Sequence, residues 1–387
     1  MRSSSDRWFG TGHSTAADSA KAGAEAAAGA LDGRAASAVF IFCSSTYDLP
    51  ALVRAVRDEA GAGPVIVGGT SLGEISAAGP TEHAVAVAAL GGEGFTVRAR
   101  VADINALGAR AAGAAVAEVM AEVESPHTVL MLLSDGHTAG PHEIVRGAYS
   151  VVGATVPLVG GYTGDDRLST ANFQLHDTDV LSGHVVGVAI GSDAPMGIGI
   201  AHGWHRIEPP MIVTKSDGHR IHEFDGEPAL DVLLRRCEVD GTTAHELFEG
   251  GLRLRPLGLS RRSGEDIRCM TGGDDGDRSV FGTAEVPQGA LVWLMESDYA
   301  SMLAGTEVSI DEALAGLGGA DPLGLLAFDC GGRKLHFGES GTREEVSTMR
   351  SALANVPFAG FYTMGEIARV RGAAGTHQLT LVTLAFA

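Results

Sequence analysis

Three stretches of this chain repeat one pattern, and this repetition limits the folds open to it more than any other feature. In each stretch a proline and a short apolar run lead to a glycine, and a second glycine followed by a carboxylate comes four or five residues later. The stretches are PVIVGGTSLGEIS from Pro64, VPLVGGYTGDD from Val156 and VPFAGFYTMGEIARV from Val356. The glycine-carboxylate pairs are Gly73-Glu74, Gly164-Asp165 and Gly365-Glu366. A turn repeated in this way indicates one supersecondary unit used three times.

Each stretch also follows a strand-like apolar run that ends in small polar residues. These runs are VFIFCSSTYD from Val39, VLMLLSDGHT from Val129 and GLLAFDCGGR from Gly324. The distance from each run to the next proline leaves room for one helix. An apolar run, a helix and a second apolar run are typical of a parallel crossover in a sheet covered by helices. We therefore predict an α/β fold with mixed sheets, in which a strand-turn-helix-strand unit occurs three times.

The chain length predicts two domains. At 387 residues the chain exceeds the size at which a single hydrophobic core keeps growing. Proline and helix-capping residues near 215–240 mark the expected boundary, and no low-complexity linker separates the halves, so we expect two closely packed domains. Only the first dozen residues read as disordered.

Charge and cysteine usage exclude several classes of protein. Forty-eight acidic against 28 basic side chains give a formal net charge of -20, which would repel nucleic acid and anionic membrane surfaces. The start lacks the apolar core of a secretion signal, and no apolar run is long enough to insert into a membrane, so we expect a cytoplasmic protein. The four cysteines are far apart in the sequence, which argues against a disulfide framework and against a thiolate zinc site.

Further elements follow from local patterns. The segments 83–90 and 95–101 read as two strands paired antiparallel around the turn GGEG. The segment 104–123 reads as the longest helix, and the region after Asp166 is rich in strands that would add antiparallel edges to the sheets.

The polar residues at the strand ends and in the repeated turns form the candidate site. Ligands of parallel sheets bind beyond the carboxyl ends of the strands, where loops converge. An arginine there could bind a carboxylate in bidentate fashion, and acidic side chains could hold an ammonium group, which together suit a zwitterion such as an amino acid. The candidate ligand-binding residues are Ser44, Ser45, Glu74, Ser134, Asp135, Gly136, Gly161, Asp165, Asp166, Cys330, Arg333, Tyr362 and Glu366.

Other interpretations of these residues remain open. Serine, aspartate and glycine after a strand are ordinary turn and helix-capping residues, and a buried carboxylate often accepts only backbone hydrogen bonds. Cys43 and Cys330 could be nucleophiles, although no local signature places a histidine beside either of them. Asp165 and Asp166 could act as an acid-base pair or hold magnesium. Because no complete catalytic constellation is visible, we assign no catalytic residue and no metal ligand.

The ordered motifs resemble those of the FIST sensory family over nearly the whole chain. They are FCSSTYD with GGTSLGEIS, LLSDGHT with VPLVGGYTGDDR, and FDCGGRK with PFAGFYTMGEIA, and the tract from Trp204 to Leu230 is similar to the family's central region. The resemblance implies a FIST N-terminal domain at 36–225 and a FIST C-terminal domain at 226–387.

The resemblance also implies a function. FIST domains are thought to bind small ligands such as amino acids and to report them to a signalling output, here a separate partner protein, because no output module is fused to the chain. Some relatives are haem proteins that sense nitric oxide. For that alternative, His137 and His377 are candidate haem ligands by position alone. A cysteine- or carboxylate-dependent enzyme is the third alternative.

Overall fold

The computed structural model describes residues 6–166, 171–249, 255–261, 264–370 and 375–387. The chain forms two compact units, each built from separate stretches of sequence. The larger unit comprises residues 1–201, 305–376 and 380–387, and the smaller unit comprises 202–304 and 377–379.

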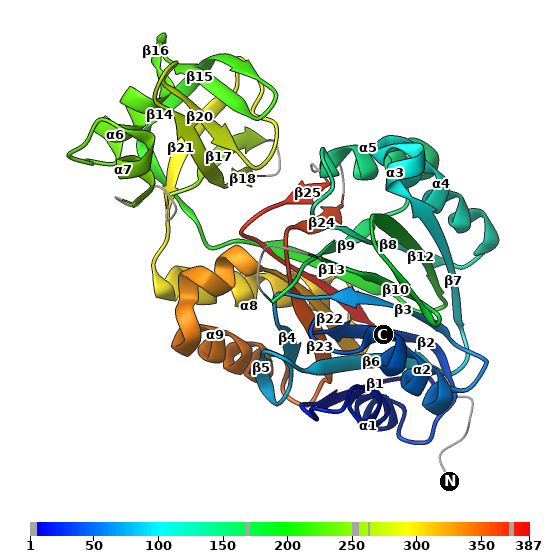
Figure 1. The fold of residues 1–387 in the computed structure, drawn as a ribbon. Coiled ribbons are helices and arrows are strands. Elements are labelled where there is room, and N and C mark those ends of the chain that lie inside the picture. Colours follow the sequence, from blue (N-terminus) through cyan, green and yellow to red (C-terminus); the bar gives the residue numbers. More distant parts are fainter. Residues whose placement is uncertain (1–5, 167–170, 250–254, 262–263, 371–374) are drawn as a thin grey trace. The chain divides into compact units, whose positions relative to one another are not determined.

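The larger unit contains three six-stranded sheets that share one strand order (Figure 1). The first sheet runs β1 (Trp8–Ser14), β6 (Val85–Gly91), β2 (Ala36–Cys43), β3 (Val65–Thr70), β10 (Gln174–His176) and β11 (Asp179–Leu181). The second runs β7 (Phe95–Asp103), β12 (His184–Ser192), β8 (His127–Asp135), β9 (Leu158–Thr163), β24 (Glu366–Arg369) and β25 (Thr376–His377). The third runs β13 (Met196–Ala201), β26 (Leu381–Phe386), β22 (Gly324–Cys330), β23 (Phe358–Thr363), β4 (Glu74–Ser76) and β5 (Gly79–Thr81).

The three predicted strand-turn-helix-strand units are confirmed. The parallel pairs β2/β3, β8/β9 and β22/β23 lie in the middle of the three sheets. Their crossover helices are α2 (Leu49–Ala60), α5 (Pro141–Val152) and α9 (Gly331–Leu353). The other pairs in these sheets whose register is described are antiparallel, so the sheets are mixed as expected.

Each strand-turn-helix-strand unit completes the sheet of another strand-turn-helix-strand unit. After β3 the chain forms the β4–β5 hairpin, which pairs with β23 of the third sheet. After β9 the β10–β11 hairpin pairs with β3 of the first sheet, and after β23 the segment containing β24 pairs with β9 of the second sheet. The three units are therefore interlocked in a closed cycle, and this exchange brings the turn of one unit against the strand ends of the next.

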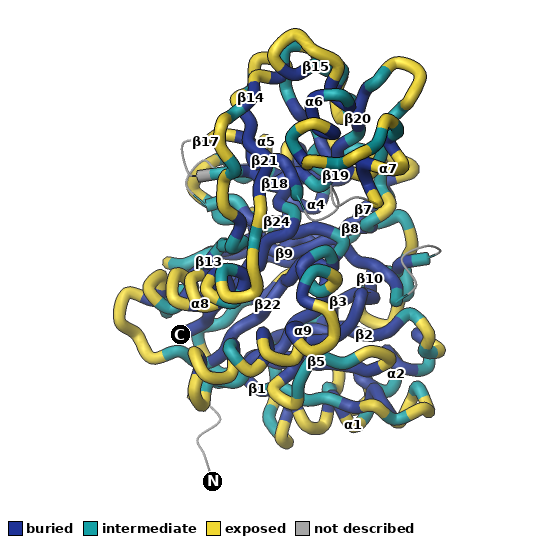
Figure 2. Tube along the Cα trace, turned by 90° about the vertical axis from the view of Figure 1, so that its left-hand side faces the viewer, coloured by how far each residue is buried: buried dark blue, intermediate teal, exposed yellow. Residues whose placement is uncertain are grey.

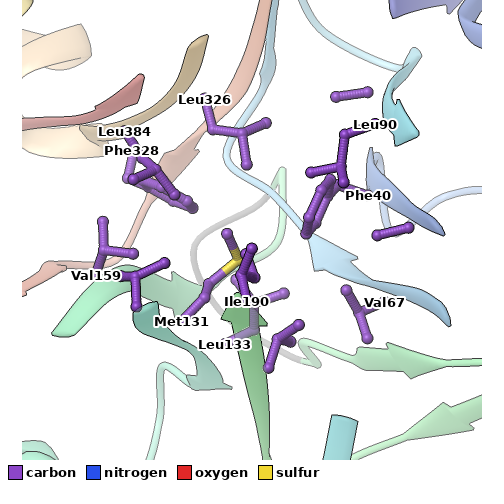
Figure 3. Packing of buried hydrophobic residues seen from close by; sticks show 14 of the residues in the cluster. Phe40, Val67, Leu90, Met131, Leu133, Val159, Ile190, Leu326, Phe328 and Leu384 are labelled. Atoms are coloured by element: carbon purple, nitrogen blue, oxygen red, sulfur yellow. The ribbon is translucent and has the colours of Figure 1, made fainter. Parts of the chain in front are cut away.

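One hydrophobic core joins the three sheets (Figure 3). The rings of Phe42 and Phe361 stack at 4.6 Å between centroids, and Phe328 meets both of them edge-on. Burying each such ring contributes roughly 1.5–3 kcal/mol.

Helices cover the opposite face of each sheet, with their outer turns exposed (Figure 2). Besides the crossover helices they are α1 (Ser19–Leu31), α3 (Ile104–Leu107), α4 (Ala109–Ala117), a 3₁₀ turn at Glu118–Glu122 and α8 (Tyr299–Ala315).

The smaller unit is an antiparallel sheet with a core of its own. Its elements in chain order are β14 (His205–Asp217), β15 (Arg220–Phe224), β16 (Glu227–Pro228), α6 (Ala229–Arg236), α7 (Ala244–Glu249), β17 (Leu257–Arg261), β18 (Gly264–Arg268), β19 (Met270–Asp274), β20 (Ser279–Gly282) and β21 (Leu291–Glu296).

Three local predictions were wrong. The strands β6 and β7 do not pair with each other, because β6 lies between β1 and β2 in the first sheet while β7 pairs with β12 in the second. The segment 104–123 is broken at Gly108, whose φ of 82° is non-helical, and α9 is longer. Within the first dozen residues, Trp8 begins an edge strand on β6.

Candidate functional site

A pocket of about 560 Å³ lies in the larger unit and is lined by residues of α9, of β5 and of the segment that follows β5. Its wall carries side chains of both charges, from Glu82 and Asp166 on one hand and Lys334 and Arg343 on the other. Leu72 and other apolar groups complete the lining. A volume of this size fits a small-molecule ligand.

A break in α9 shapes one wall of this pocket. Gly338 has φ of 63° and ψ of -178°, which no residue in an α-helix adopts, and it divides α9 into two helical segments. Glycine tolerates this left-handed conformation because it has no Cβ. The hydroxyl of Thr342 donates a hydrogen bond to the Gly338 carbonyl at 2.7 Å, which fixes the break. Both residues line the pocket.

Lys334 is the partly buried cation of the pocket. Its Nζ donates to the Leu72 carbonyl at 2.7 Å and to Glu82 Oε1 at 2.8 Å, and only 19% of the side chain is exposed. The hydrogen bond from Lys334, and next its charge, lower the pKa of Glu82. A lysine ammonium has three donor hydrogens, so one of them is available to a ligand.

Asp166 is the buried anion of the pocket wall. Its Oδ2 accepts a hydrogen bond from the Ser44 hydroxyl and lies 3.3 Å from His83 Nδ1, while its side chain is only 6% exposed. Its Oδ1 is buried and has no hydrogen-bond partner in the part of the chain that the structure describes. Leaving a buried acceptor unsatisfied costs about 1–3 kcal/mol, so such an atom usually has a partner such as a water, an ion or a ligand.

The repeated turns place three equivalent side chains, and one of them differs from the sequence-based assignment. Glu74, Gln174 and Glu366 stand opposite the same position of β23, β3 and β9, namely Phe361, Gly69 and Gly161. Asp165, aligned with the glutamates by its preceding glycine, instead accepts a hydrogen bond from Ala171 N. The second unit has a longer turn, so the equivalent position falls at Gln174.

These three side chains make the same pair of hydrogen bonds. Ser71 and Thr363 donate to Glu74 and Glu366 at 2.6 and 2.7 Å, while Gln174 Nε2 donates to Thr163 at 2.8 Å. The other oxygen of each glutamate accepts the backbone N–H of Ala84 or Thr380 at 3.2 Å, and the single oxygen of Gln174 accepts the N–H of His184 at 3.0 Å. Each of the three side chains thus joins its turn to the backbone at the start of the next long strand, which is β6, β12 or β26. We call each such pair of hydrogen bonds a latch.

Burial changes the charge state of the two glutamates. It raises the pKa of Glu74 to about 8, although the Ser71 hydrogen bond acts in the opposite direction. Burial also raises the pKa of Glu366. A protonated carboxyl can donate one hydrogen bond and accept another, as the amide of Gln174 does. The latches therefore work without a net charge near neutral pH.

Arg333 lies inside the protein. Its guanidinium binds Asp329 Oδ1 at 2.8 Å, Glu345 Oε1 at 2.5 Å and the Thr306 hydroxyl at 3.0 Å, and all three ionisable side chains are 0% exposed. Asp135 is occupied elsewhere, by His137 N, Asn172 Nδ2 and Gly183 N at 2.7, 3.2 and 2.9 Å. The structure therefore does not place these two predicted anchors on the pocket.

The remaining predicted residues divide among several places. Ser44 joins Asp166, and Cys330 lies beside Glu366, whose pKa its hydrogen bond lowers. Ser45 is half-buried in its turn, Ser134 and Tyr362 are buried with hydroxyls that have no partner among the described residues, and a Cβ at Gly136 or Gly161 would overlap a threonine. Of the predicted set, only Asp166 lines the pocket.

Among the pocket residues that were not predicted from the sequence, Lys334 and Glu82 matter most for ligand binding. Lys334 directly follows Arg333 in the GGRK motif, and Glu82 lies in the loop after β5. Neighbouring residues on a helix point about 100° apart, so one can face the interior while the other faces a pocket. The helical phase of the GGRK motif would have shown that Arg333 and Lys334 point in different directions.

Comparison with known proteins agrees with this architecture. Residues 37–227 match the FIST N domain, and residues 229–369 match the FIST C domain. The chain belongs to the FIST family. A relative in Mycobacterium tuberculosis, named only as an uncharacterized protein, is 28% identical over 387 residues, which cover 96% of this chain and 97% of the relative. Uncharacterized proteins of Mycobacterium bovis and Methanocaldococcus jannaschii are 28% and 25% identical over 65% and 37% of the chain, and over 65% and 30% of the relatives' own lengths. FIST domains are associated with sensing in signal transduction.

The residues of this FIST pocket do not fit haem. Its lining, within the described part of the chain, offers no imidazole, thiolate or phenolate to ligate iron. His137 is exposed in the loop after β8, and His377 is buried in a two-residue strand. Among the residues described, no group of three or more histidine, cysteine, aspartate and glutamate side chains could hold a metal ion.

Cys43 is poorly suited to nucleophilic chemistry. It is fully buried at the end of β2, and burial, followed by the charge of Glu74, raises its thiol pKa well above the ordinary value. A reactive cysteine needs the thiolate form.

Within the described residues, no helix has both the length and the apolar composition to cross a bilayer.

Proposed function

We propose that this FIST protein is a cytoplasmic sensor that binds a small zwitterion, such as an amino acid, in the pocket beside α9 and signals to a separate partner protein. The observation that carries the proposal is the Oδ1 of Asp166, which has no hydrogen-bond partner among the described residues and belongs to a pocket that also holds the Lys334 ammonium. A ligand carboxylate suits Lys334 and a ligand ammonium suits Asp166. The buried free thiols are in keeping with a reducing compartment.

Replacing Lys334 with methionine should abolish most of the amino-acid binding. A hydrogen bond to a charged group contributes about 1.5–3 kcal/mol, so the dissociation constant should rise roughly tenfold or more. Titration calorimetry with the amino acids that raise the melting temperature of the wild-type protein measures this change. Lys21→Met is the matched control, because Lys21 forms an exposed pair with Glu25 on α1, outside the pocket lining.

Two outcomes would contradict the proposal. One is that no amino acid raises the melting temperature, although saturation with a ligand stabilises a folded protein by roughly 3 kcal/mol at a hundredfold excess over the dissociation constant. The other is equal binding by Lys334→Met and the wild-type protein. A Soret band in protein purified from haem-supplemented cells would favour the haem alternative instead.

A further inference from the structure

Two consecutive residues of one loop occupy both charged anchors of the pocket. Glu82 follows β5 and binds Lys334 Nζ at 2.8 Å, and His83 Nδ1 lies 3.3 Å from Asp166 Oδ2. The same nitrogen lies 3.5 Å from the Ser44 hydroxyl and 3.4 Å from the Thr46 hydroxyl, and it forms an ion pair with Asp166 when the imidazole is protonated. The loop thus sets a carboxylate beside the lysine and an imidazole beside the aspartate, where the two charged groups of an amino acid would lie.

Of the three equivalent loops in the interlocked sheets, the one before Ala84 carries these side-chain contacts. In the interlocked sheets, Ala84, His184 and Thr380 are equivalent because each donates its N–H to a latch side chain. The residues before them, His83, Gly183 and Leu379, all have positive φ, of 56°, 71° and 52°. The left-handed backbone therefore belongs to the fold, whereas the side-chain contacts to Lys334 and Asp166 belong to this site alone.

The side-chain contacts of the loop with its two anchors are exposed, while the Tyr47 hydroxyl donates to the His83 carbonyl at 2.9 Å. The side chains of Glu82 and His83 are 65% and 63% exposed, and exposed ion pairs contribute little to stability. One end of the loop continues from β5, an edge strand that pairs with β4 alone among the described strands. The other end is fixed at Ala84, which bonds Glu74 through its N–H and Ser44 through its carbonyl.

We infer that Glu82 and His83 are a built-in competitor for the ligand, and that a bound zwitterion displaces them and frees the loop. This inference rests on the proposed function of the pocket. A molecule with one charge displaces only one of the two contacts, so the loop favours ligands that carry both charges. The freed loop and the β5 edge then change a surface that a partner can read.

The loop contacts are tested first in the absence of any ligand. Hydrogen exchange of the amides of residues 81–83 should be severalfold faster in Glu82→Gln and in His83→Gly than in the wild-type protein. Glycine is suited to position 83 because Gly183 has the same conformation in the second unit. Unchanged exchange in both variants overturns the inference, whether or not the pocket binds anything.

Three small probes then test competition. Titrations followed by NMR use glycine, acetate and methylammonium. Glu82→Gln should bind glycine and acetate about two- to fivefold more tightly than the wild-type protein, and His83→Gly should bind glycine and methylammonium more tightly by a similar factor. Glu25→Gln is the matched control, because Glu25 forms an exposed pair with Lys21 on α1, outside the pocket lining.

The direction in which the glycine affinity of Glu82→Gln changes distinguishes the proposed competitor from the proposed function of the pocket. If Glu82 simply contacts the ligand, Glu82→Gln weakens glycine binding or leaves it equal, which overturns the competitor while the pocket stands. If neither the variants nor the wild-type protein binds any probe or amino acid, the proposed function fails, and the competitor fails with it even where the exchange rates rise.

Discussion

Replacing Arg333 with methionine should lower the free energy of unfolding by about 3–5 kcal/mol. The guanidinium is the cation that Asp329 and Glu345 share in a fully buried cluster. Burial, and next the charge of Glu345, raise the pKa of Asp329 well above its ordinary value. Removing the cation leaves two buried carboxyls that share a hydrogen bond but have lost the counter-charge of Arg333. Urea denaturation measures the loss.

Two further variants make this prediction specific. Arg343→Met removes a guanidinium of the same helix, but its pair with Glu339 is exposed, so the loss should stay within about 1 kcal/mol. Adding Glu345→Gln to Arg333→Met should recover part of the stability, because it removes one of the two acids. An Arg333→Met protein as stable as the wild type would show that the cluster does not depend on its cation.

The same cluster changes how ligand binding has to be tested. An Arg333 variant that no longer binds a ligand would be expected from loss of structure alone. Lys334, one residue further along α9, reaches the pocket through an amine whose remaining partners are a carbonyl and an exposed carboxylate. A substitution of Lys334 is therefore the more informative test of ligand binding.

The sequence reveals the repeated unit because its signal is local. Apolar runs of strand length, one intervening helix and a glycine turn all lie within a single unit, and β2/β3, β8/β9 and β22/β23 form as that pattern predicts. Strand partners across units are not local. The exchange of the β4–β5 hairpin to β23 joins residues that are almost 300 positions apart, and no periodicity encodes it.

The wrong hairpin prediction has a physical reason that the sequence does contain. Every residue of β6 is buried, which is typical of a strand in the middle of a sheet, whereas β7 carries the exposed Arg98 and is an edge strand. The apolar run VAVAAL and the mixed run FTVRAR already differ in this way. A short turn between two strands does not by itself make them neighbours.

The candidate site was predicted less well because residue type does not fix direction. Polar residues do gather at the strand ends, but Glu74, Glu366 and Arg333 point into the interior and bond there. The alignment of Asp165 with the glutamates failed because an insertion moved the equivalent position to Gln174. That glutamine shows what the position requires, which is a neutral donor and acceptor.

Stability should fall as the pH rises from about 4.5 to about 8, and the two latch glutamates should cause much of the fall. An unfolded glutamate ionises near 4.5, whereas folded Glu74 keeps its proton until about 8 because burial disfavours the charged form. Between these values the folded state binds more protons than the unfolded state, so a rising pH favours unfolding. For Glu74 the difference is on the order of 5 kcal/mol.

Glutamine at both positions should remove this dependence. The amide of Gln174 already joins the equivalent hydroxyl and backbone N–H in the second unit, so Glu74→Gln with Glu366→Gln should match the wild-type protein near pH 5 and exceed its stability by several kcal/mol near pH 9. Glu59→Gln, which replaces an exposed carboxyl on α2, is the matched control. Urea denaturation across this range measures each slope. A double variant with the wild-type slope would mean that the latches are ionised in the folded protein, and that the amide in the second unit is a substitute for charge rather than the form that all three latches share.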